Sequence, residues 1–403
     1  MNRGRVSSCA ILIVVCASPV QAEDRDLAGM SSDRLGRARQ VLQEAVASKT
    51  VGSAVGLISR SGRIVFEEAV GEAAPNVPMP VDAIVRLASI TKPVTAAAIL
   101  ALNEQGRLAL TDAVESYLPE FHDVKVAAGD GLEPPMRPIT LHDLLTHQAG
   151  LMPDNTAELN AVWEKAETTA GFSRLLAALP LRFQPGTRWE YGPGYEVLTA
   201  VVEKITGQSY AAFLESSLLA PLKMKDTTFH VSGAALQRLV TQYRRDPAGE
   251  LAVFRALGQE ERPTTFYSGG GGLRSTVQDF HRFALCLLRG GALEGVRVLS
   301  PKSVELMTAD HAGSRYPREH YGYGLGVEVR TAAGGDSLGS VGAFSWNGGT
   351  GTLFVVDPPE QLVVIIFAPT TPGTPGVAAL RRAFVNAAYQ AIVASAPPAA
   401  LAD

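Results

Sequence analysis

Cysteine is scarce in this chain. Among its 403 residues there are three cysteines, and two of them, Cys9 and Cys16, fall within the first 22 residues. If that segment is removed as a signal peptide, Cys286 stands alone and an internal disulfide is excluded. The fold must then be stabilised by its hydrophobic core, which a chain of this length is able to bury.

Basic residues are not in excess either. The chain has 36 lysines and arginines against 40 acidic residues, a formal net charge of −4, and no stripe of basic residues. A nucleic-acid-binding protein presents a basic surface to the phosphates. The composition therefore gives no sign of a nucleic-acid partner.

A long apolar run is also missing. The apolar stretch from Ala10 to Val20 is shorter than the roughly 20 residues that a membrane-spanning helix needs. It follows Arg3 and Arg5 and leads into small residues that end at Ala22, a pattern typical of a secretory signal. The sequence therefore predicts a signal peptide over residues 1–22 and a periplasmic or secreted protein, with no stable membrane insertion.

One short motif points to chemistry. Ser89 and Lys92 lie three residues apart at the start of a helix expected from about Ser89 to Gln105, and residues at this spacing share one helix face. A serine hydroxyl needs an adjacent base to act as a nucleophile. Lys92 can serve if its environment lowers its pKa toward about 7–8. The N–H of Ser89, at the helix start, lacks an intrahelical partner and is able to stabilise an oxyanion.

Strand and helix patterns gather at the two ends of the chain. Helical spacing from Leu35 to Lys49 is followed by Ser53–Ile58 and Arg63–Val70, which predict a hairpin around Ser61-Gly62. Strands and helices at both ends of the chain, on either side of a mainly helical middle, predict an α+β fold. Its antiparallel sheet would be built from N- and C-terminal segments and flanked by helices. The C-terminal elements are expected over Gly324–Arg330, Thr350–Val356, Leu362–Ala368 and, as a helix, Leu380–Ala394.

The middle of the chain has another character. Pro119–Pro138 is rich in proline and glycine, and Ile139 to about Thr265 is mostly helical in pattern. We therefore expect an α/β catalytic domain formed by residues 23–120 and 266–395, with a helical subdomain inserted over 121–265. Residues 396–403 are expected to be a disordered tail.

Three other sequence patterns could indicate a functional site, but each lacks a feature that such a site needs. Residues 335–339 match the G-x-S-x-G nucleophile elbow, but every histidine precedes Ser337, whereas the elbow's histidine follows its serine. We interpret this segment as part of a hairpin turn. Gly269–Gly272 lacks the Lys-Ser/Thr of a phosphate loop, so a close backbone approach near the active site is expected there. No zinc-ligand spacing occurs, and neither a metal nor another cofactor is expected.

Several motifs along the chain occur together in one family. The chain resembles the serine hydrolases that share a fold with class C β-lactamases, D-alanyl-D-alanine peptidases and family VIII carboxylesterases. The resemblance implies a β-lactamase/transpeptidase-like fold. The motifs that carry it are Arg86–Pro93 (RLASITKP), Leu144–Leu151 (LLTHQAGL), Pro185–Tyr191 (PGTRWEY), Gly271–Thr276 (GGLRST) and the strand pair around Asp357-Pro358.

The resemblance also implies roles for particular residues. Tyr191 corresponds to the family tyrosine of the Y-x-N motif, which takes the proton from the serine, as a phenolate or through a shuttle with the lysine, and later activates water. The family's strand motif corresponds to the substrate-binding residues Trp346, Asn347 and Gly348. The backbone N–H of Gly349 would then be the second oxyanion donor, beside that of Ser89.

Two positions depart from the family pattern. Pro193 replaces the asparagine of Y-x-N, which in the family recognises the amide of β-lactams and peptides. Trp346 replaces the lysine that attracts a substrate carboxylate, and an uncharged indole cannot form that charge-assisted bond. Family VIII carboxylesterases have this kind of tryptophan. His147, which lies inside a family motif, is interpreted as a hydrogen-bonded structural residue.

The sequence therefore predicts a serine carboxylesterase whose partner is a small neutral ester with a short acyl chain, hydrolysed through an acyl-enzyme on Ser89. Lys92 and Tyr191 would move the protons. A class C-like β-lactamase or D-Ala-D-Ala carboxypeptidase is the alternative on the same scaffold. A non-catalytic scaffold or binding protein is the alternative of another class, and it predicts the loss of a catalytic side chain, whereas all three are present.

Overall fold

The computed structural model of the protein describes residues 27–395, apart from 155, 261–264 and 336. The predicted signal peptide over residues 1–22 and the predicted tail over 396–403 lie outside the described residues. In the part of the chain that is described, no helix has the length and apolar character needed to span a membrane.

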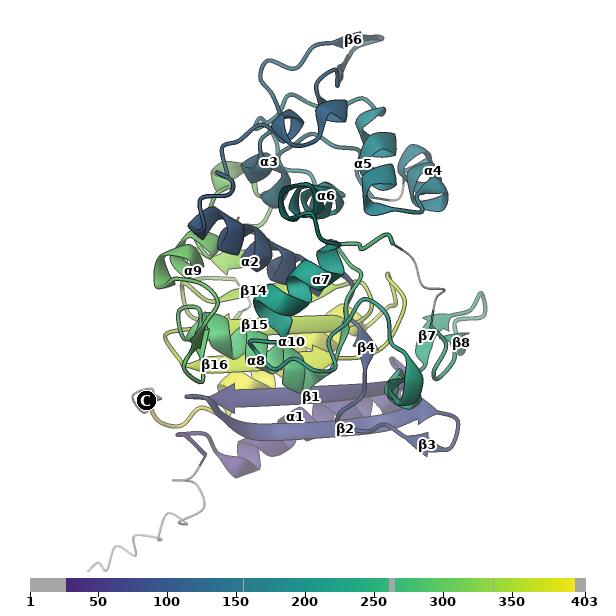
Figure 1. The fold of residues 1–403 in the computed structure, drawn as a ribbon. Coiled ribbons are helices and arrows are strands. Elements are labelled where there is room, and N and C mark those ends of the chain that lie inside the picture. The colour runs from purple at the N-terminus through teal and green to yellow at the C-terminus, as the bar shows by residue number, and fades with distance from the viewer. Residues whose placement is uncertain (1–26, 155, 261–264, 336, 396–403) are drawn as a thin grey trace, which may run out of the picture.

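An antiparallel sheet forms the centre of the described chain (Figure 1), with the strand order β12-β13-β14-β15-β16-β1-β2-β3. The first strand pairs with the last, so that Gly56 lies opposite Ile366. This pairing confirms the predicted α+β fold with a sheet built from both ends of the chain. The strands are β1 (Ser53–Arg60), β2 (Arg63–Ala74), β3 (Val77–Pro78), β12 (Tyr321–Tyr323), β13 (Glu328–Arg330), β14 (Phe344–Gly348), β15 (Thr352–Asp357) and β16 (Leu362–Phe367).

Two turns in the sheet bear on the predicted strands, one between β1 and β2 and one between β12 and β13. Ser61 and Gly62 join β1 to β2 with φ values of 51° and 81°, the backbone that a tight hairpin turn needs. The strand predicted over Gly324–Arg330 begins too early: a turn through Gly326 follows β12, and only Glu328–Arg330 of that range form a strand, β13. A Cβ on Gly326 would lie 3.1 Å from the carbonyl oxygen of Lys92, so this turn packs closely on the candidate site.

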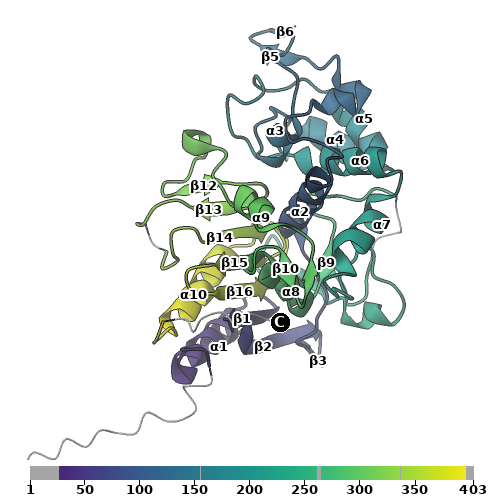
Figure 2. The same cartoon turned by 60° about the vertical axis from the view of Figure 1, so that its left-hand side comes forward.

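Helices cover both faces of the sheet (Figure 2). Along β16, Val364 and Ile366 join the core beneath α1 and α10, while Val363 and Ile365 join the core that contains α2 and α8. Neighbouring residues of a strand point to opposite faces, so burial on both sides explains why β16 is apolar throughout. These four helices are α1 (Ser32–Ala47), α2 (Thr91–Glu104), α8 (Val277–Leu288) and α10 (Val377–Gln390).

The middle of the chain supplies most of the helices drawn above the sheet in Figure 1. They are α3 (Leu141–Leu145), α4 (Ala157–Lys165), α5 (Thr169–Ala177), α6 (Gly194–Thr206) and, lower down, α7 (Tyr210–Leu214). The expected helical pattern does not hold for residues 242–255, which form a hairpin. The Asp-Pro-Ala-Gly segment at 246–249 favours the turn between its two strands. The division into a catalytic domain and an inserted subdomain stays a prediction.

Short ribbons and helical turns complete the described chain. The ribbon of β4 and β9 matters most for function, because β4 leads directly into the segment that carries Ser89. The remaining elements are β4 (Val85–Arg86), β5 (Val126–Ala128), β6 (Gly131–Glu133), β7 (Gln242–Arg245), β8 (Leu251–Arg255), β9 (Arg274–Ser275), β10 (Ala292–Leu293), β11 (Val296–Arg297) and α9 (Pro301–Met307).

Candidate active site

Ser89 is half-buried and lies in a 3₁₀ turn, η2 (Ala88–Ile90), immediately before α2. The residue before it, Ala88, has φ 49°, in the left-handed region that residues with a side chain seldom adopt. Holding a residue there costs about 1–3 kcal/mol, and such strain is found at functional sites. The backbone beside the candidate nucleophile must therefore be held by its surroundings.

Two threonines from the β14–β15 turn hold that backbone. Thr350 Oγ1 donates to the carbonyl oxygen of Arg86 at 2.6 Å, and Thr352 Oγ1 donates to that of Leu87 at 2.7 Å. Gly348 packs against the same segment, since a Cβ there would lie 2.2 Å from the Leu87 oxygen. Neither threonine could be predicted from the sequence, because a contact between segments so far apart in the chain leaves no local pattern.

Lys92 lies one turn beyond Ser89 and is buried, with 5% of its surface exposed. Its Nζ donates to the carbonyl oxygen of Gly270 at 2.8 Å and is 3.4 Å from Ser89 Oγ. The same atom lies 4.6 Å from the centre of the Tyr191 ring. The contact with Gly270 confirms the close backbone approach expected at Gly269–Gly272.

The electrostatics of Lys92 differ from the expectation. Burial by itself lowers the pKa of Lys92, but the charges of Tyr191 and Glu196 outweigh burial, so the pKa lies above its ordinary value. The lowering toward 7–8 that Lys92 would need to act as the base is therefore not found, because the structure places Tyr191 and Glu196 close to the amine. Lys92 stays an ammonium near neutral pH. It can donate hydrogen bonds and stabilise a neighbouring anion.

Tyr191 reaches Ser89 from a distant loop. Its hydroxyl donates to Ser89 Oγ at 2.7 Å, from the segment just before α6. The three side chains that the sequence analysis singled out are thus within contact distance of one another. A phenol oxygen at this distance is placed to exchange a proton with the serine.

His147 packs against Tyr191 and forms hydrogen bonds with the residues on either side of it. It is 3% exposed, its ring centre lies 4.5 Å from that of Tyr191, and its Nδ1 accepts from the N–H of Gly192 at 3.4 Å. The backbone N–H of Glu190 donates to its carbonyl oxygen at 2.9 Å. Burial, with a smaller contribution from Lys92, holds the pKa of His147 well below its usual range. It is a neutral residue under the loop, as the structural interpretation requires.

A cavity of about 590 Å³ opens in front of Ser89. All three tryptophans of the chain line this cavity, and Asn347 and Gly349 line it together with Ser89. Gly348 lies behind this wall, at the end of β14. The lining residues are Ala88, Ser89, Asp154, Asn160, Trp163, Trp189, Tyr191, Trp346, Asn347, Gly349 and Pro372.

The cavity wall carries little charge. Asp154 is the one charged residue among the described residues that line it. Arg381, on α10, lies behind the wall: its Nη1 is 3.2 Å from Asn347 Oδ1, and its Nη2 donates to the carbonyl oxygen of Gly348. Burial lowers the pKa of Arg381 to about 10. Because Arg381 occupies the oxygen of Asn347, the amide nitrogen of that side chain is free to donate into the cavity.

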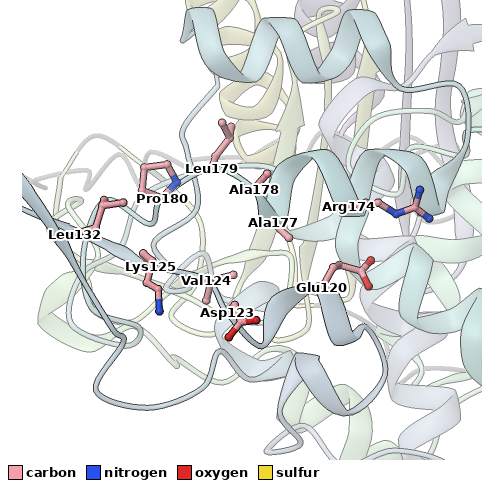
Figure 3. A pocket seen from close by; sticks show the side chains of 10 residues that line it. All are labelled: Glu120, Asp123, Val124, Lys125, Leu132, Arg174, Ala177, Ala178, Leu179 and Pro180. Carbon is pink, nitrogen blue, oxygen red and sulfur yellow. The ribbon is translucent and has the colours of Figure 1, made fainter.

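A second cavity, of about 310 Å³, has no comparable chemistry (Figure 3). In the view of Figure 3, Leu132 and Pro180 lie on one side of it, with Glu120 and Arg174 on the other. No serine, cysteine, histidine or tyrosine is among the described residues that line it. They are Glu120, Asp123, Val124, Lys125, Leu132, Arg174, Ala177, Ala178, Leu179 and Pro180.

The G-x-S-x-G segment does not form a nucleophile elbow. Ser337 lies in the connection between β13 and β14, two strands of one sheet, and not in the strand-to-helix turn that a nucleophile elbow needs. Over the residues described, no three histidine, cysteine or acidic side chains come together as metal ligands would.

Comparison with known proteins agrees with this geometry. The model of the Beta-lactamase family matches residues 38–388, and the chain belongs to that family. Its fold is β-lactamase/transpeptidase-like. The chain is 31% identical to Esterase EstB of Burkholderia gladioli over 366 residues, which cover 82% of this chain and 89% of that protein.

Other relatives have different printed activities. A putative D-alanyl-D-alanine carboxypeptidase of Escherichia coli K12 is 27% identical, over 77% of each chain. Among solved structures, EstCE1, described as a hydrolase with promiscuous acyltransferase activity, superimposes with a TM-score of 0.75 and 26% identity, and covers 89% of this chain and 99% of that one.

Proposed function

We propose that the protein is a serine carboxylesterase that hydrolyses neutral esters with short acyl chains. Membership of the Beta-lactamase family and the similarity to EstB and EstCE1 support a serine hydrolase of the esterase type. The observation that carries the proposal is the arrangement at Ser89, whose Oγ lies 2.7 Å from the Tyr191 oxygen and 3.4 Å from Lys92 Nζ.

The proposed mechanism has two halves. Tyr191, as a phenolate stabilised by the Lys92 ammonium, takes the proton of the Ser89 hydroxyl while Oγ attacks the ester carbonyl carbon. The N–H groups of Ser89 and Gly349 hold the oxyanion, and Tyr191 then passes the proton to the departing alcohol. In the second half, Tyr191 takes a proton from water, and the hydroxide formed attacks the acyl carbon. The bond between this carbon and Ser89 Oγ then breaks, Tyr191 returns the proton to Oγ, and the acid leaves.

The composition of the cavity supports a neutral substrate. Three tryptophans offer apolar surface, and the charged lining residue, Asp154, is an acid that repels a carboxylate. Arg381 lies behind the wall, and its guanidinium donates to Asn347 and Gly348. An ester without charge loses less hydration on entry than a β-lactam carboxylate does.

A substrate panel tests the proposal. We expect p-nitrophenyl acetate and butyrate to be turned over far faster than nitrocefin or a peptide ending in D-Ala-D-Ala. Ser89→Ala should lose at least about 10³-fold of the ester activity, and Tyr191→Phe about 10²–10⁴-fold. Near-normal ester turnover by Ser89→Ala would remove the assignment of the nucleophile.

The two alternatives give different results in the same experiments. A β-lactamase or D-Ala-D-Ala carboxypeptidase, the class that the Escherichia coli relative represents by name, would prefer nitrocefin or the peptide to the esters. A non-catalytic binding protein would turn over none of them, and Ser89 would not be labelled by a fluorophosphonate. Labelling of Ser89, read as a mass increase on its peptide, would exclude the binding protein.

Export to the periplasm or the medium, through the signal peptide over residues 1–22, is part of the proposal. N-terminal sequencing of the protein from the producing cell tests it, with a start at Glu23 as the expected result.

A further inference from the structure

A buried carboxylate, which no motif pointed to, lies close to the Lys92 amine. Glu196 belongs to the first turn of α6 and is 3% exposed. Its Oε1 accepts from Ser268 Oγ at 2.7 Å and from the N–H of Gly270 at 3.0 Å. Both donors are neutral. Burial raises the pKa of the Glu196 carboxyl group, and the Lys92 ammonium acts against burial and favours the carboxylate. Removing a charge from water costs free energy unless the charge is paired and hydrogen-bonded.

Gly270 joins the two charged groups. Its N–H donates to Glu196 Oε1 while its carbonyl oxygen accepts from Lys92 Nζ at 2.8 Å. A Cβ on this residue would lie 2.4 Å from Glu196 Oε1, so only glycine allows the approach. The carbonyl of Gly269 accepts from Thr95 Oγ1, one turn after Lys92, at 2.8 Å. The loop is thus fixed both to α6 and to the helix that carries the amine.

We propose that Glu196 is a positioning residue for Lys92: through the N–H of Gly270 it fixes the carbonyl that binds the ammonium, and its negative charge balances that ammonium beside Ser89. The inference rests on the acyl-enzyme function proposed above. Glu196 is not among the described residues that line the cavity, so it acts on the reaction through Lys92.

The surroundings of Lys92 show why this charge matters. Burial disfavours the ammonium, and a buried cation that loses a neighbouring anion gives up its proton more easily. Without the charge of Glu196, the amine becomes neutral at lower pH and no longer stabilises the Tyr191 phenolate. The titratable groups that face Lys92 are Tyr191 from the loop before α6, Glu196 and Tyr195 from α6, His147 from the segment after α3, and Asp154 from the cavity wall.

The pH dependence of ester hydrolysis tests the inference. In Glu196→Gln, which keeps the shape and removes the charge, we expect kcat to fall about tenfold or more with little change in KM. The alkaline limb of the kcat profile should move to lower pH by about one unit. Glu196→Asp keeps the charge, so its alkaline limb should stay near that of the wild type even if kcat falls. Glu203→Gln is the matched control, because Glu203 lies on the same helix and bonds instead to the N–H of Tyr210.

The outcomes separate this inference from the proposed function. If Ser89 of the wild type is labelled by a fluorophosphonate, but Glu196→Gln keeps the wild-type alkaline limb, Glu196 does not position Lys92 and the esterase still stands. If the wild type is neither labelled nor active, the proposed function itself is wrong. Should circular dichroism show that Glu196→Gln is unfolded, Ser268→Ala weakens the same link. A lower kcat at unchanged KM then supports the role, and a wild-type kcat overturns it.

Discussion

Two buried cations lie in different regions of this molecule, and their surroundings differ. Arg60, at the end of β1, has no exposed surface, and its guanidinium is 2.7 Å from the carboxylate of Glu360. Lys92 is also buried, but it has one carbonyl partner and otherwise faces the Ser89 hydroxyl and the Tyr191 ring. The other acceptors of Arg60 are the carbonyl oxygens of Ala28, Gly29, Glu360 and Ala394.

The difference distinguishes a structural cation from a reactive one. The acceptors of Arg60 are mostly backbone groups, so the side chain ties the first and last described segments to the sheet and has nothing to exchange. Two neighbours of Lys92 are groups that change protonation during the proposed reaction. A charge with fixed acceptors stabilises the fold, whereas a charge beside reacting groups stabilises what forms there.

The largest effect that this comparison predicts is on rate. Lys92→Ala should lower kcat/KM for p-nitrophenyl butyrate by about 10³–10⁴-fold, because the Tyr191 phenolate loses its ammonium. The melting temperature should also fall, because the buried Glu196 carboxylate loses its cation, so the rate is compared per folded molecule. Lys204→Ala, at an exposed position of α6, is the control. More than a tenth of the wild-type rate in Lys92→Ala would remove Lys92 from the mechanism.

The matching change at the other cation should act on stability. Arg60→Met should lower the free energy of unfolding by about 3 kcal/mol, because the carbonyl oxygens around it lose their donor. Urea denaturation measures this loss, and kcat per folded molecule should stay unchanged. Arg60→Lys keeps the charge but not the fork of donors, so an intermediate loss is expected. A fall in kcat of the folded Arg60→Met protein would mean that the two regions are coupled.

The sequence predicted the part of the site that is local. The three-residue spacing placed the Lys92 amine near Ser89, and the family motif identified Tyr191, because both depend on a few neighbouring residues. Glu196 was missed because nothing local indicates that α6 turns a carboxylate toward α2. The direction of the Lys92 pKa shift could not be predicted for the same reason. Similarly, apolar patterning predicted a sheet from both termini but not the hairpin over residues 242–255.

A buried histidine shows how burial shifts a pKa when no neighbouring anion among the described residues opposes the shift. His281, on α8, is 6% exposed and lies 2.7 Å from the hydroxyl of Ser59, the neighbour of Arg60. Burial, with the charges of Arg282 and Arg289, lowers the pKa of His281 to about 4. The unfolded chain, with a histidine pKa near 6.5, therefore binds the proton first. The stability that neutral His281 provides is full above about pH 6.5 and is lost as the pH falls toward 4.

The pH dependence of unfolding measures this loss. Between pH 7.5 and 5, His281 should account for about 2 kcal/mol of lost stability, from a pKa difference of about 2.5 units. His281→Gln should abolish that part of the slope and leave the contributions of other groups. If the variant and the wild type lose stability in parallel over this range, the histidine is not buried as a neutral base.

The smallest predicted effect concerns the charge of the cavity in front of Lys92. Asp154 repels an anionic substrate, so Asp154→Asn should raise kcat/KM for nitrocefin about fivefold relative to that for p-nitrophenyl butyrate, as expected for one charge acting at close range through water. Asn160→Asp adds a charge to the same wall and should shift the ratio the other way. The ratio of two substrates cancels any shared loss of active enzyme. If neither substitution changes it, substrate choice is set by the shape of the tryptophan wall and not by charge.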